Sequence, residues 1–370
     1  MKINLNKNDL KEFDRILETK EINISVADMF IDYVENYANN ITDANMLLVD
    51  EDSQEESYLQ LVLENLEIDM NNIENKAIVE RFILPGVNKQ DLEEYQNNPY
   101  YKNINPADEE FKNWRLEFIK YKPFECFFSN DVTVFPDDYY KEVTNIGFFN
   151  KETKYLAVLE NDMIWMAIIP NEITTMQKPI ADAYGNVITF GLGLGYFAYM
   201  SALKEEVKHV TIVEKDETVI KIFNEYLLPK FVDKDKITIV KADAKEYLNS
   251  KDFDKNNYDF LFIDLWHNPN DGLEYYIDFK NQEPKHSKTT FSYWLEQGIL
   301  CLLRRCLISL IDEEINGSDD TNYQESECYT DKVINALHYL LKEKELNSFE
   351  QIKMLLSDES LRSISKDLFI

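Results

Sequence analysis

Apolar residues recur at two different spacings along the chain, and the change of spacing predicts how it is organised. In residues 1 to about 120 they lie three and four apart, as in DLKEFDRILETKEI and SVADMFIDYVENYANNI, which predicts helices. The acidic stretch VDEDSQEES is expected to be a solvated loop. From about 115 to 170 the segments FECFFSNDVTVF and YLAVLENDMIWMAIIP are rich in Val, Phe, Tyr and Ile, which predicts strands, with LENDM as a hairpin turn.

The second half of the chain alternates strand-like and helix-like segments. A short helix, PNEITTMQKPIADAYG, is expected to close at Gly185. Strand-like runs then recur at 186–191, 209–215, 237–242 and 258–265. Helical stretches between them predict βαβ units and hence a parallel sheet.

Beyond about residue 290 the pattern is mostly helical. The segment FSYWLEQGILCLLRRCLISLIDEEI has room for one strand at Ile299–Leu303, but it is more typical of a single helix. Residues 313–328 are expected to form a polar loop, and the tail after them to be helical. The sheet is therefore expected to be truncated, with helices covering its end.

Composition narrows the partners of this 370-residue chain. Its formal net charge of −30 disfavours nucleic acid, which requires clustered Lys and Arg. The acidity is explained by solubility, with a cationic substrate as the sharper alternative. The polar start MKINLNKNDLKEF lacks the apolar core of a signal peptide. The longest apolar run contains Arg304 and Arg305 and is too short to span a bilayer, so we expect a cytoplasmic protein without membrane contact.

Cysteine usage agrees with that compartment. Cys126, Cys301, Cys306 and Cys328 form no CxxC pair. Ordinary reduced thiols are expected, and no metal site is predicted.

A glycine-rich turn is the strongest local motif. VITFGLGLGYFAYM, Val187 to Met200, runs from a strand through three of the chain's nine glycines into a helix, the usual mouth of a nucleotide pocket. A dinucleotide site needs glycine at the first, third and sixth positions, but the sixth is Tyr196, whose bulk argues against the close approach of helix and strand. An ATP loop needs Gly-Lys-Ser/Thr, which is absent. Both phosphate readings lack a required part.

Carboxylates follow the next three predicted strands. Glu214, Asp243 and Asp264 each come where a strand ends. S-adenosylmethionine (SAM) carries no phosphate but offers a ribose diol, an amine, an amino-acid end and a sulfonium, which need such acceptors. A helix N-cap is the competing explanation for any single acid, Asp243 above all.

These ordered pieces resemble a known family. From roughly Pro170 to Pro269 the chain is similar to class I SAM-dependent methyltransferases, nearest to the spermidine-synthase-like branch. The resemblance implies an α/β fold with a Rossmann-like, doubly wound, mainly parallel sheet, and SAM as cofactor. It also implies roles for particular residues: the backbone of Gly191, Gly193 and Gly195 near the methionine end, Glu214 on the ribose hydroxyls, Asp243 and the Ala244 N–H on adenine, and Asp264 on the amino group or the incoming substrate.

The helix before the first strand is a further candidate. Glu172 and Met176 lie four residues apart and so share a face, and related enzymes place a helix here over the cofactor. We expect Glu172 to join the cofactor site and Met176 to serve packing.

The group transferred is less defined. The segment DLWHNPND offers Asp264, His267 and Asp271 as acids or bases, and Trp266 for a ring or a cation. It reproduces neither the Asp/Asn-Pro-Pro-Tyr/Phe of amino-methylating DNA enzymes nor the Asp-Ser-Ser-Asp-Pro of spermidine synthases, since His267 replaces the second Asp. We predict methyl transfer to a small, non-nucleic-acid acceptor with Asp264 and His267 as catalytic residues; aminopropyl transfer and a non-catalytic SAM-binding module are the alternatives.

The chain is accordingly expected to have four parts: a mostly helical region at 1–120, a small β region at 121–170, the SAM-binding domain at 171–312 and a helical appendage at 313–370. Residues 1–170 carry no family signature and are expected to select substrate or to bind a partner. The sequence leaves the oligomeric state open.

Overall fold

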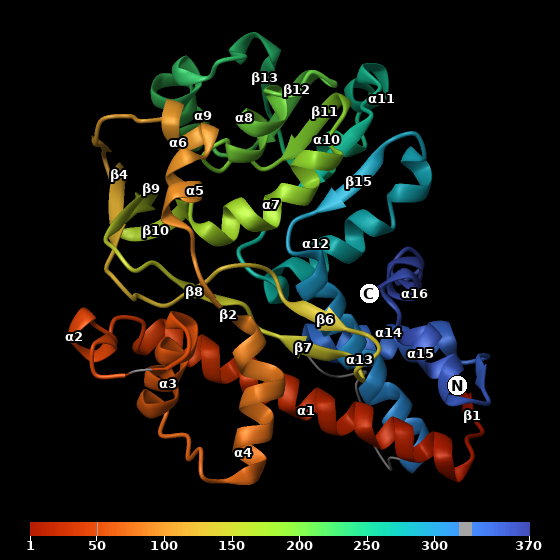
Figure 1. The fold of residues 1–370 in the computed structure, drawn as a ribbon. Helices are drawn as coiled ribbons and strands as arrows, with labels where there is room; N and C mark the ends of the chain where they lie inside the picture. Colours follow the sequence, from red (N-terminus) through yellow and green to blue (C-terminus); the bar gives the residue numbers. More distant parts are fainter. Residues whose placement is uncertain (50, 318–327) are drawn as a thin grey trace.

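A five-stranded parallel sheet lies in the upper part of Figure 1, in the computed structural model, which describes residues 1–49, 51–317 and 328–370. The strand order is β13-β12-β11-β14-β15, and every neighbouring pair is parallel. The strands are β11 (Gly185–Phe190), β12 (Val207–Glu214), β13 (Ile237–Lys241), β14 (Phe260–Ile263) and β15 (Thr290–Tyr293). This is the Rossmann-like α/β fold that the sequence predicts.

The order of the strands fixes where a ligand can bind. The chain moves outward from β11 to β13, then returns to place β14 against the other side of β11. In such sheets the carboxyl ends of the two strands at the reversal diverge, and ligands bind in the gap between their loops. The glycine turn follows β11 and Asp264 follows β14, so both lie at this point.

Hydrophobic strands and helices build the core around the sheet. All four residues of β14 are buried, as are most of β11 and β12, whereas β13 at the edge is partly exposed. Continuous apolar runs of this kind suit strands that are covered on both faces. The covering helices are α7 (Pro170–Asp182), α8 (Tyr196–Ala202), α9 (Glu217–Ile222), α10 (Ala244–Leu248), α11 (Lys251–Asn256), α12 (Pro269–Lys280) and α13 (Glu296–Asn316).

At the end of the sheet, the structure excludes the alternative of a strand at Ile299–Leu303. Ile299–Leu303 is not a strand but part of the helix α13, while the fifth strand, β15, lies just before it in TFSY. Four residues beside β14 suffice for β15 because its partner's backbone supplies the pairing, which a local pattern does not reveal. Within the described residues the parallel sheet stops there, and α12 packs against α13 beyond it, as expected for a truncated sheet.

In the N-terminal region the structure confirms and extends one prediction and corrects another. The two helical segments form one continuous helix, α1 (Lys7–Asn36), because the polar Asn23 in its middle is buried and bonds to the backbone of Tyr140 and Glu142. The acidic stretch is a loop only in part, since helix α3 (Gln54–Asn65) begins inside it with Ser53 as its N-cap. Acidic side chains in its first turn are favoured by the helix dipole.

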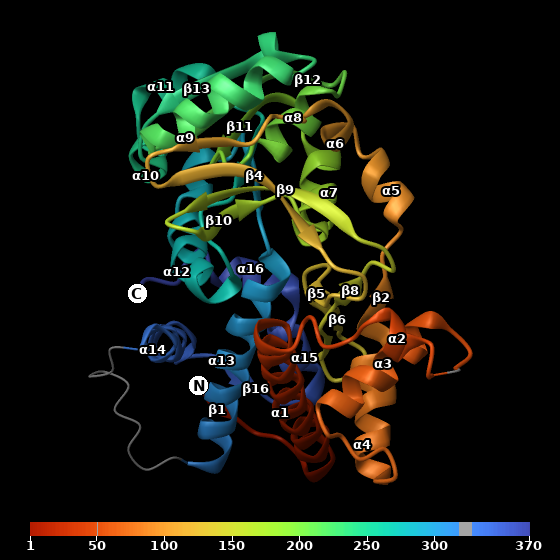
Figure 2. The same ribbon diagram turned by 90° about the vertical axis from the view of Figure 1, so that its left-hand side faces the viewer.

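A four-stranded antiparallel sheet, in the order β10-β9-β4-β3, lies beside the glycine turn and the α9 segment (Figure 2). Its strands are β3 (Glu109–Phe111), β4 (Trp114–Tyr121), β9 (Thr153–Glu160) and β10 (Met163–Ala167). Asn161 and Asp162 at positive φ make the predicted hairpin turn between β9 and β10. The strands of this region begin at Glu109, earlier than the pattern suggests.

Smaller elements complete the first half of the chain. The short strands are β2 (Val87–Lys89), β5 (Phe127–Phe128), β6 (Thr133–Phe135), β7 (Lys141–Val143) and β8 (Ile146–Phe148). The short helices are α2 (Asp43–Met46), α4 (Ile73–Ile78), α5 (Leu92–Asn97) and α6 (Pro99–Asn103). Single π or 3₁₀ turns occur at η1 (Val79–Ile83), η2 (Leu84–Gly86), η3 (Phe223–Leu227), η4 (Leu228–Lys230), η5 (Lys234–Lys236) and η6 (Glu283–His286).

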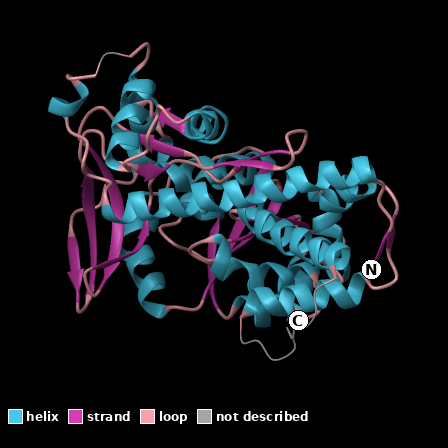
Figure 3. Ribbon diagram, turned by 90° about the horizontal axis from the view of Figure 1, so that it is seen from below, coloured by secondary structure: helices cyan, strands magenta, loops and turns pink. Residues whose placement is uncertain are grey.

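The two ends of the chain lie on the same side of the molecule, among helices (Figures 1 and 3). Strand β1 (Lys2–Ile3) pairs with β16 (Glu345–Leu346). The tail is largely helical, as predicted: α14 (Tyr329–Leu341), α15 (Phe349–Leu356) and α16 (Asp358–Ile364). Of the predicted polar loop at 313–328, residues 313–316 belong to α13 and residues 318–327 lie outside the described part.

Two smaller findings bear on the sequence analysis. Helix α7 ends at Asp182, so Gly185 does not close it but opens β11 in a left-handed conformation. None of the helices within the described residues combines the length and apolarity needed to cross a bilayer.

Candidate functional site

The glycine turn adopts a backbone that requires glycine. Gly191, Gly193 and Gly195 all have positive φ, at 95°, 50° and 77°. A Cβ on Gly191 would lie 2.0 Å from the carbonyl oxygen of Asp264, and one on Gly195 would lie 2.4 Å from the Phe223 ring. At Gly191 the turn therefore lies directly against the backbone of Asp264, at the base of the gap between the two loops, and the clustered glycines in the sequence indicated such a close approach.

Glu214 anchors that turn. Its carboxylate ends β12 and accepts from the backbone N–H groups of Leu192 (3.2 Å), Lys215 (2.7 Å) and Asp216 (2.8 Å). An ionised carboxylate offers about four lone-pair sites. Three are in use, so Glu214 has room for roughly one ribose hydroxyl rather than two, unless Leu192 releases its bond.

Asp243 plays the capping role that was its competing explanation. Its Oδ1 accepts from Lys245 N (2.9 Å) and Glu246 N (3.1 Å) at the start of α10. The side chain is exposed, and its Oδ2 has no hydrogen bond within the described residues. A cap uses one oxygen and leaves the other available to an exocyclic amine. Ala244, the first residue of α10, is buried beside it.

Glu172 and Asp264 form a pair of acids at the reversal of the sheet. Glu172 lies in the first turn of α7, is 8% exposed, and its Oε2 has no hydrogen-bond partner in the described chain. Burial raises the pKa of Glu172 well above its ordinary value, and repulsion from the Asp264 carboxylate raises it further. Asp264 is partly exposed, yet burial raises its pKa to about 7. Neither acid forms an ion pair with a described Lys or Arg.

His267 lies apart from that pair. Its side chain is 74% exposed, and its Nδ1 lies 3.4 Å from Asp271 Oδ2. Asp271 also accepts from the backbone N–H groups of His267 and Asn268, so it belongs to the capping box of α12. The structure therefore does not bring His267 to Asp264 through any described contact. No three His, Cys, Asp or Glu side chains of the described chain gather as a metal site would require.

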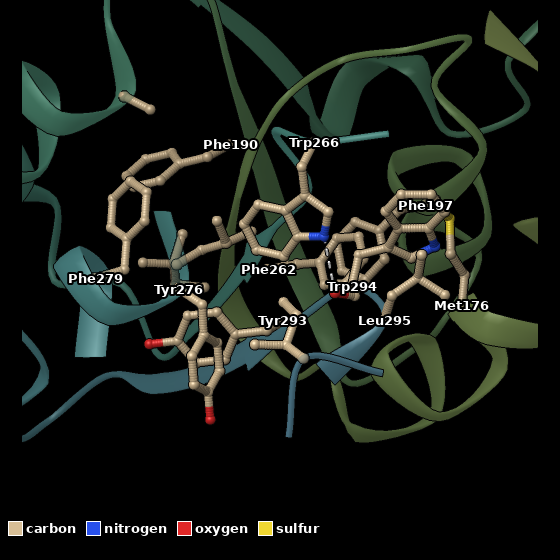
Figure 4. Packing of buried hydrophobic residues seen from close by; sticks show 14 of the residues in the cluster. Met176, Phe190, Phe197, Phe262, Trp266, Tyr276, Phe279, Tyr293, Trp294 and Leu295 are labelled. Atoms are coloured by element: carbon tan, nitrogen blue, oxygen red, sulfur yellow. Dashed lines mark hydrogen bonds between the residues drawn. The ribbon is translucent and has the colours of Figure 1, made fainter. Parts of the chain in front are cut away.

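Trp266 is a core residue rather than a surface for substrate. Its ring is 5% exposed and its Nε1 donates to the carbonyl of Trp294 at 3.2 Å (Figure 4). The Trp294 indole N–H donates to Thr175 of α7 at 2.9 Å. Met176 of α7 lies near Trp294 in the buried hydrophobic cluster that Figure 4 shows. Packing therefore holds α7 on the sheet edge, and Met176 has the packing role that the sequence predicts.

Residues from the first half of the chain cover the glycine turn. Met166 of β10 packs on Gly193, where a Cβ would lie 3.1 Å from its Cε. Tyr100 of α6 is fully buried and donates its hydroxyl to the Leu194 carbonyl at 2.6 Å. Sequence reasoning missed both residues, because the contacts join segments tens of residues apart and neither segment carries a periodic or motif signal.

The position of Tyr196 corrects one argument. Its ring packs against Tyr100, with centroids 5.4 Å apart, and its hydroxyl accepts from Asn98 at 2.8 Å. The residue that packs on the sheet is Phe197, whose ring stacks on Phe262 with centroids 4.3 Å apart. The bulk of Tyr196 therefore does not hold α8 away from the strands, and the steric argument against a dinucleotide does not stand.

The fold and site define an α/β protein with a glycine turn and strand-end acids at the reversal of a parallel sheet. No family model matches the chain, and no curated protein matches it. Among solved structures it is similar to the spermidine synthase of Thermotoga maritima, with 14% identity over 60% of this chain and 75% of that one and a TM-score of 0.28. It is also similar to a spermidine synthase in complex with the transition state analogue AdoDATO, with 15% identity, 60% and 74% coverage and a TM-score of 0.28. Likeness at this level does not bear on function, so the functional argument rests on the geometry.

Proposed function

We propose that the protein is a transferase that binds an adenosyl sulfonium at the reversal of the sheet, with SAM as donor and methyl transfer as the reaction. The acceptor is a small molecule and not a nucleic acid. The donor supplies a carbon made electrophilic by the positive sulfur. The proposal otherwise concerns what the residues of this chain do.

The observation that carries the proposal is the pairing of Glu172 with Asp264 beside the glycine turn. Placing an unpaired carboxyl in the interior is costly, and the orphaned Glu172 Oε2 makes it more so. A cationic ligand between the two acids would lower both pKa values and satisfy the free oxygen. A sulfonium and an amino group are such cations, whereas the phosphates of NAD or ATP would meet repulsion here.

The other acids fit the remaining parts of the same ligand. Glu214 lies on the neighbouring strand β12 with about one acceptor site left for a ribose hydroxyl. Asp243, one strand further, has its Oδ2 for an exocyclic amine. Strand β11, which carries the glycine turn, is followed in the sheet by β12 and β13, so their carboxyl ends succeed one another as the parts of an adenosyl group would.

Asp264 has the pKa of a useful base. With a pKa near 7 it is partly ionised at neutral pH and can take the proton that an attacking amine or hydroxyl loses. Transfer then forms a bond from that nucleophile to the donor carbon and breaks the carbon–sulfur bond, leaving a neutral thioether. His267, which is exposed, is the second candidate base and would have to approach from the solvent side.

Aminopropyl transfer is the second candidate, and one feature favours it. SAM brings a carboxylate with its amino group, and the described residues that flank Glu172 and Asp264 supply no Lys or Arg to pair with it. Decarboxylated SAM keeps the ammonium and the sulfonium but lacks the carboxylate, so no group on it would be repelled by the two acids. A non-catalytic SAM-binding module requires the same binding geometry without turnover.

A thermal-shift panel with S-adenosylhomocysteine, SAM, decarboxylated SAM and NAD tests the proposal. A ligand present at 100 times its dissociation constant stabilises the native state by about 2.7 kcal/mol. We expect the adenosyl compounds to raise the melting temperature and Glu172→Gln to reduce that rise. The matched control is Glu205→Gln, at an exposed site remote from the sheet edge.

The panel has outcomes that separate the candidates. Stabilisation by NAD but by none of the sulfur compounds would refute the donor assignment. Preference for decarboxylated SAM over SAM would replace methyl with aminopropyl transfer. If the donor binds but yields no S-adenosylhomocysteine or methylthioadenosine with any acceptor tried, the non-catalytic module would be favoured.

A further inference from the structure

A cavity lies behind the glycine turn, and neither Glu172 nor Asp264 lines it. It has a volume of about 540 Å³, within the range of small-molecule sites. Its walls come from residues 90–99, from one face of α7 and from α8, and they include Glu94, Tyr95, Ile173, Gln177 and Tyr196. None of the four strand-end or helix acids of the candidate donor site takes part in its lining.

The chemistry of the lining selects a class of ligand. The cavity has two carboxylates, Asp91 and Glu94, and no Lys, Arg or His. One oxygen of Asp91 accepts the hydrogen bonds that cap α5, whereas the Glu94 carboxylate has no hydrogen bond or ion pair among the described residues. An anionic ligand would therefore meet repulsion without compensation, and a cation would find a carboxylate that is not yet engaged.

The remaining wall suits an apolar body. The rings of Tyr95 and Tyr196 line the cavity together with Ile173 and Met200. Both tyrosine hydroxyls are already hydrogen-bonded, Tyr95 to the Ile168 carbonyl and Tyr196 to Asn98. The two residues therefore contribute aromatic surface to the cavity rather than hydrogen-bond donors. Aromatic faces attract ammonium groups as well as covering apolar surface.

The cavity is joined to the glycine turn by two hydrogen bonds. Asn98, in the cavity wall, donates to Tyr196, the first residue of α8, and Tyr100 two residues later donates to Leu194 inside the turn. Helix α7 adds a second link, because Glu172 faces the donor site while Ile173 and Gln177 face the cavity. Ordering residues 90–100 would thus restrain the turn.

We propose that this cavity is a second ligand site, that it takes a small organic ammonium ion with an apolar body, and that its occupancy rigidifies the glycine turn through Tyr100. The inference does not depend on which donor the sheet edge binds. It assigns to the N-terminal region a binding role of its own.

Three probes with one scaffold and three charges test the ligand class: cyclohexylmethylammonium, cyclohexylmethanol and cyclohexanecarboxylate. We expect titration by ligand-observed NMR to show binding of the ammonium and at least tenfold weaker binding of the other two. Glu94→Gln should weaken the ammonium about two- to fivefold, as expected for an exposed charge pair. The adjacent Glu93→Gln, outside the cavity, is the matched control and should change nothing.

Filling the cavity tests the place. Ile173→Trp should abolish binding while leaving the circular dichroism spectrum unchanged, and Gln177→Trp, at an exposed position of the same wall, provides a second variant if the first does not fold. Equal binding of the carboxylate or the alcohol, or wild-type binding by a folded tryptophan variant, would overturn the assignment.

Hydrogen exchange tests the link to the turn. The ammonium probe should slow amide exchange in residues 191–195, the part of the turn that Tyr100 contacts, severalfold in the wild type. In Tyr100→Phe, which keeps the ring but loses the bond to Leu194, the probe should still bind, with no more than a severalfold change in affinity, and should no longer slow exchange in these residues. Slowing that persists in Tyr100→Phe, or no slowing in the wild type at saturation, would refute the coupling.

Discussion

Replacing Asp264 by Asn should stabilise the protein, and the gain should depend on pH. The carboxyl of Asp264 has its pKa raised from 3.8 to about 7 by burial, beside a second buried acid. A shift of that size corresponds to a loss of about 4 kcal/mol in the free energy of unfolding when the group is ionised. Asn has nearly the same shape and no charge to bury.

The direction follows from the proton balance. Below about pH 4 the carboxyl is protonated in both the folded and the unfolded chain, so the substitution changes little. Between about pH 4 and 7 the unfolded chain has released its proton while the folded chain retains it, and wild-type stability falls by about 1.4 kcal/mol per pH unit. Above about pH 7 the difference stays constant. The excess stability of Asp264→Asn should therefore rise through this window and then level off.

Urea unfolding at about pH 5, 6, 7 and 8, followed by fluorescence, measures the effect. Asp235→Asn, at an exposed position, removes the same charge and serves as the control. If the free energies of unfolding of Asp264→Asn and the wild type run parallel across this range, the carboxyl is not buried uncompensated and the reasoning fails. Adding Glu172→Gln to Asp264→Asn should increase the free energy of unfolding by less than Glu172→Gln does in the wild type, because the repulsion between the two carboxylates is already gone.

The other predictions concern the turn and its surroundings. Gly195→Ala places a Cβ 2.4 Å from Phe223 at a φ of 77°, so its melting temperature should fall by several degrees, whereas Ser201→Ala on the same helix, whose buried hydroxyl has no partner in the described chain, should change it little. Glu214→Ala should weaken S-adenosylhomocysteine about tenfold to a hundredfold by calorimetry, and wild-type affinity in that variant would contradict the assignment. His267→Ala, at an exposed side chain, should leave the unfolding free energy within about 0.5 kcal/mol, so any loss of turnover would report on catalysis alone.

The sequence by itself determined the central sheet and its turn. Four strands were predicted correctly. For β11, β12 and β14 the apolar runs are nearly continuous because strands buried on both faces have few polar positions, whereas the edge strand β13 was indicated by its β-branched residues. Gly191 and Gly195 were readable because positive φ and close backbone approach leave few other residues possible. The acids at the strand ends were readable for a related reason: each follows directly on an apolar run that marks its place in the fold.

Features set by distant contacts were decided by the tertiary structure alone. Strand β15 exists because β14 offers it a backbone partner, and α1 continues through Asn23 because the backbone near Tyr140 satisfies that side chain. Glu172 was a candidate from its helical position. Its burial beside Asp264 depends on how α7 lies across the sheet edge, and burial is what raises the pKa of both acids. Local spacing fixes which residues share a face, but what that face meets is set by packing.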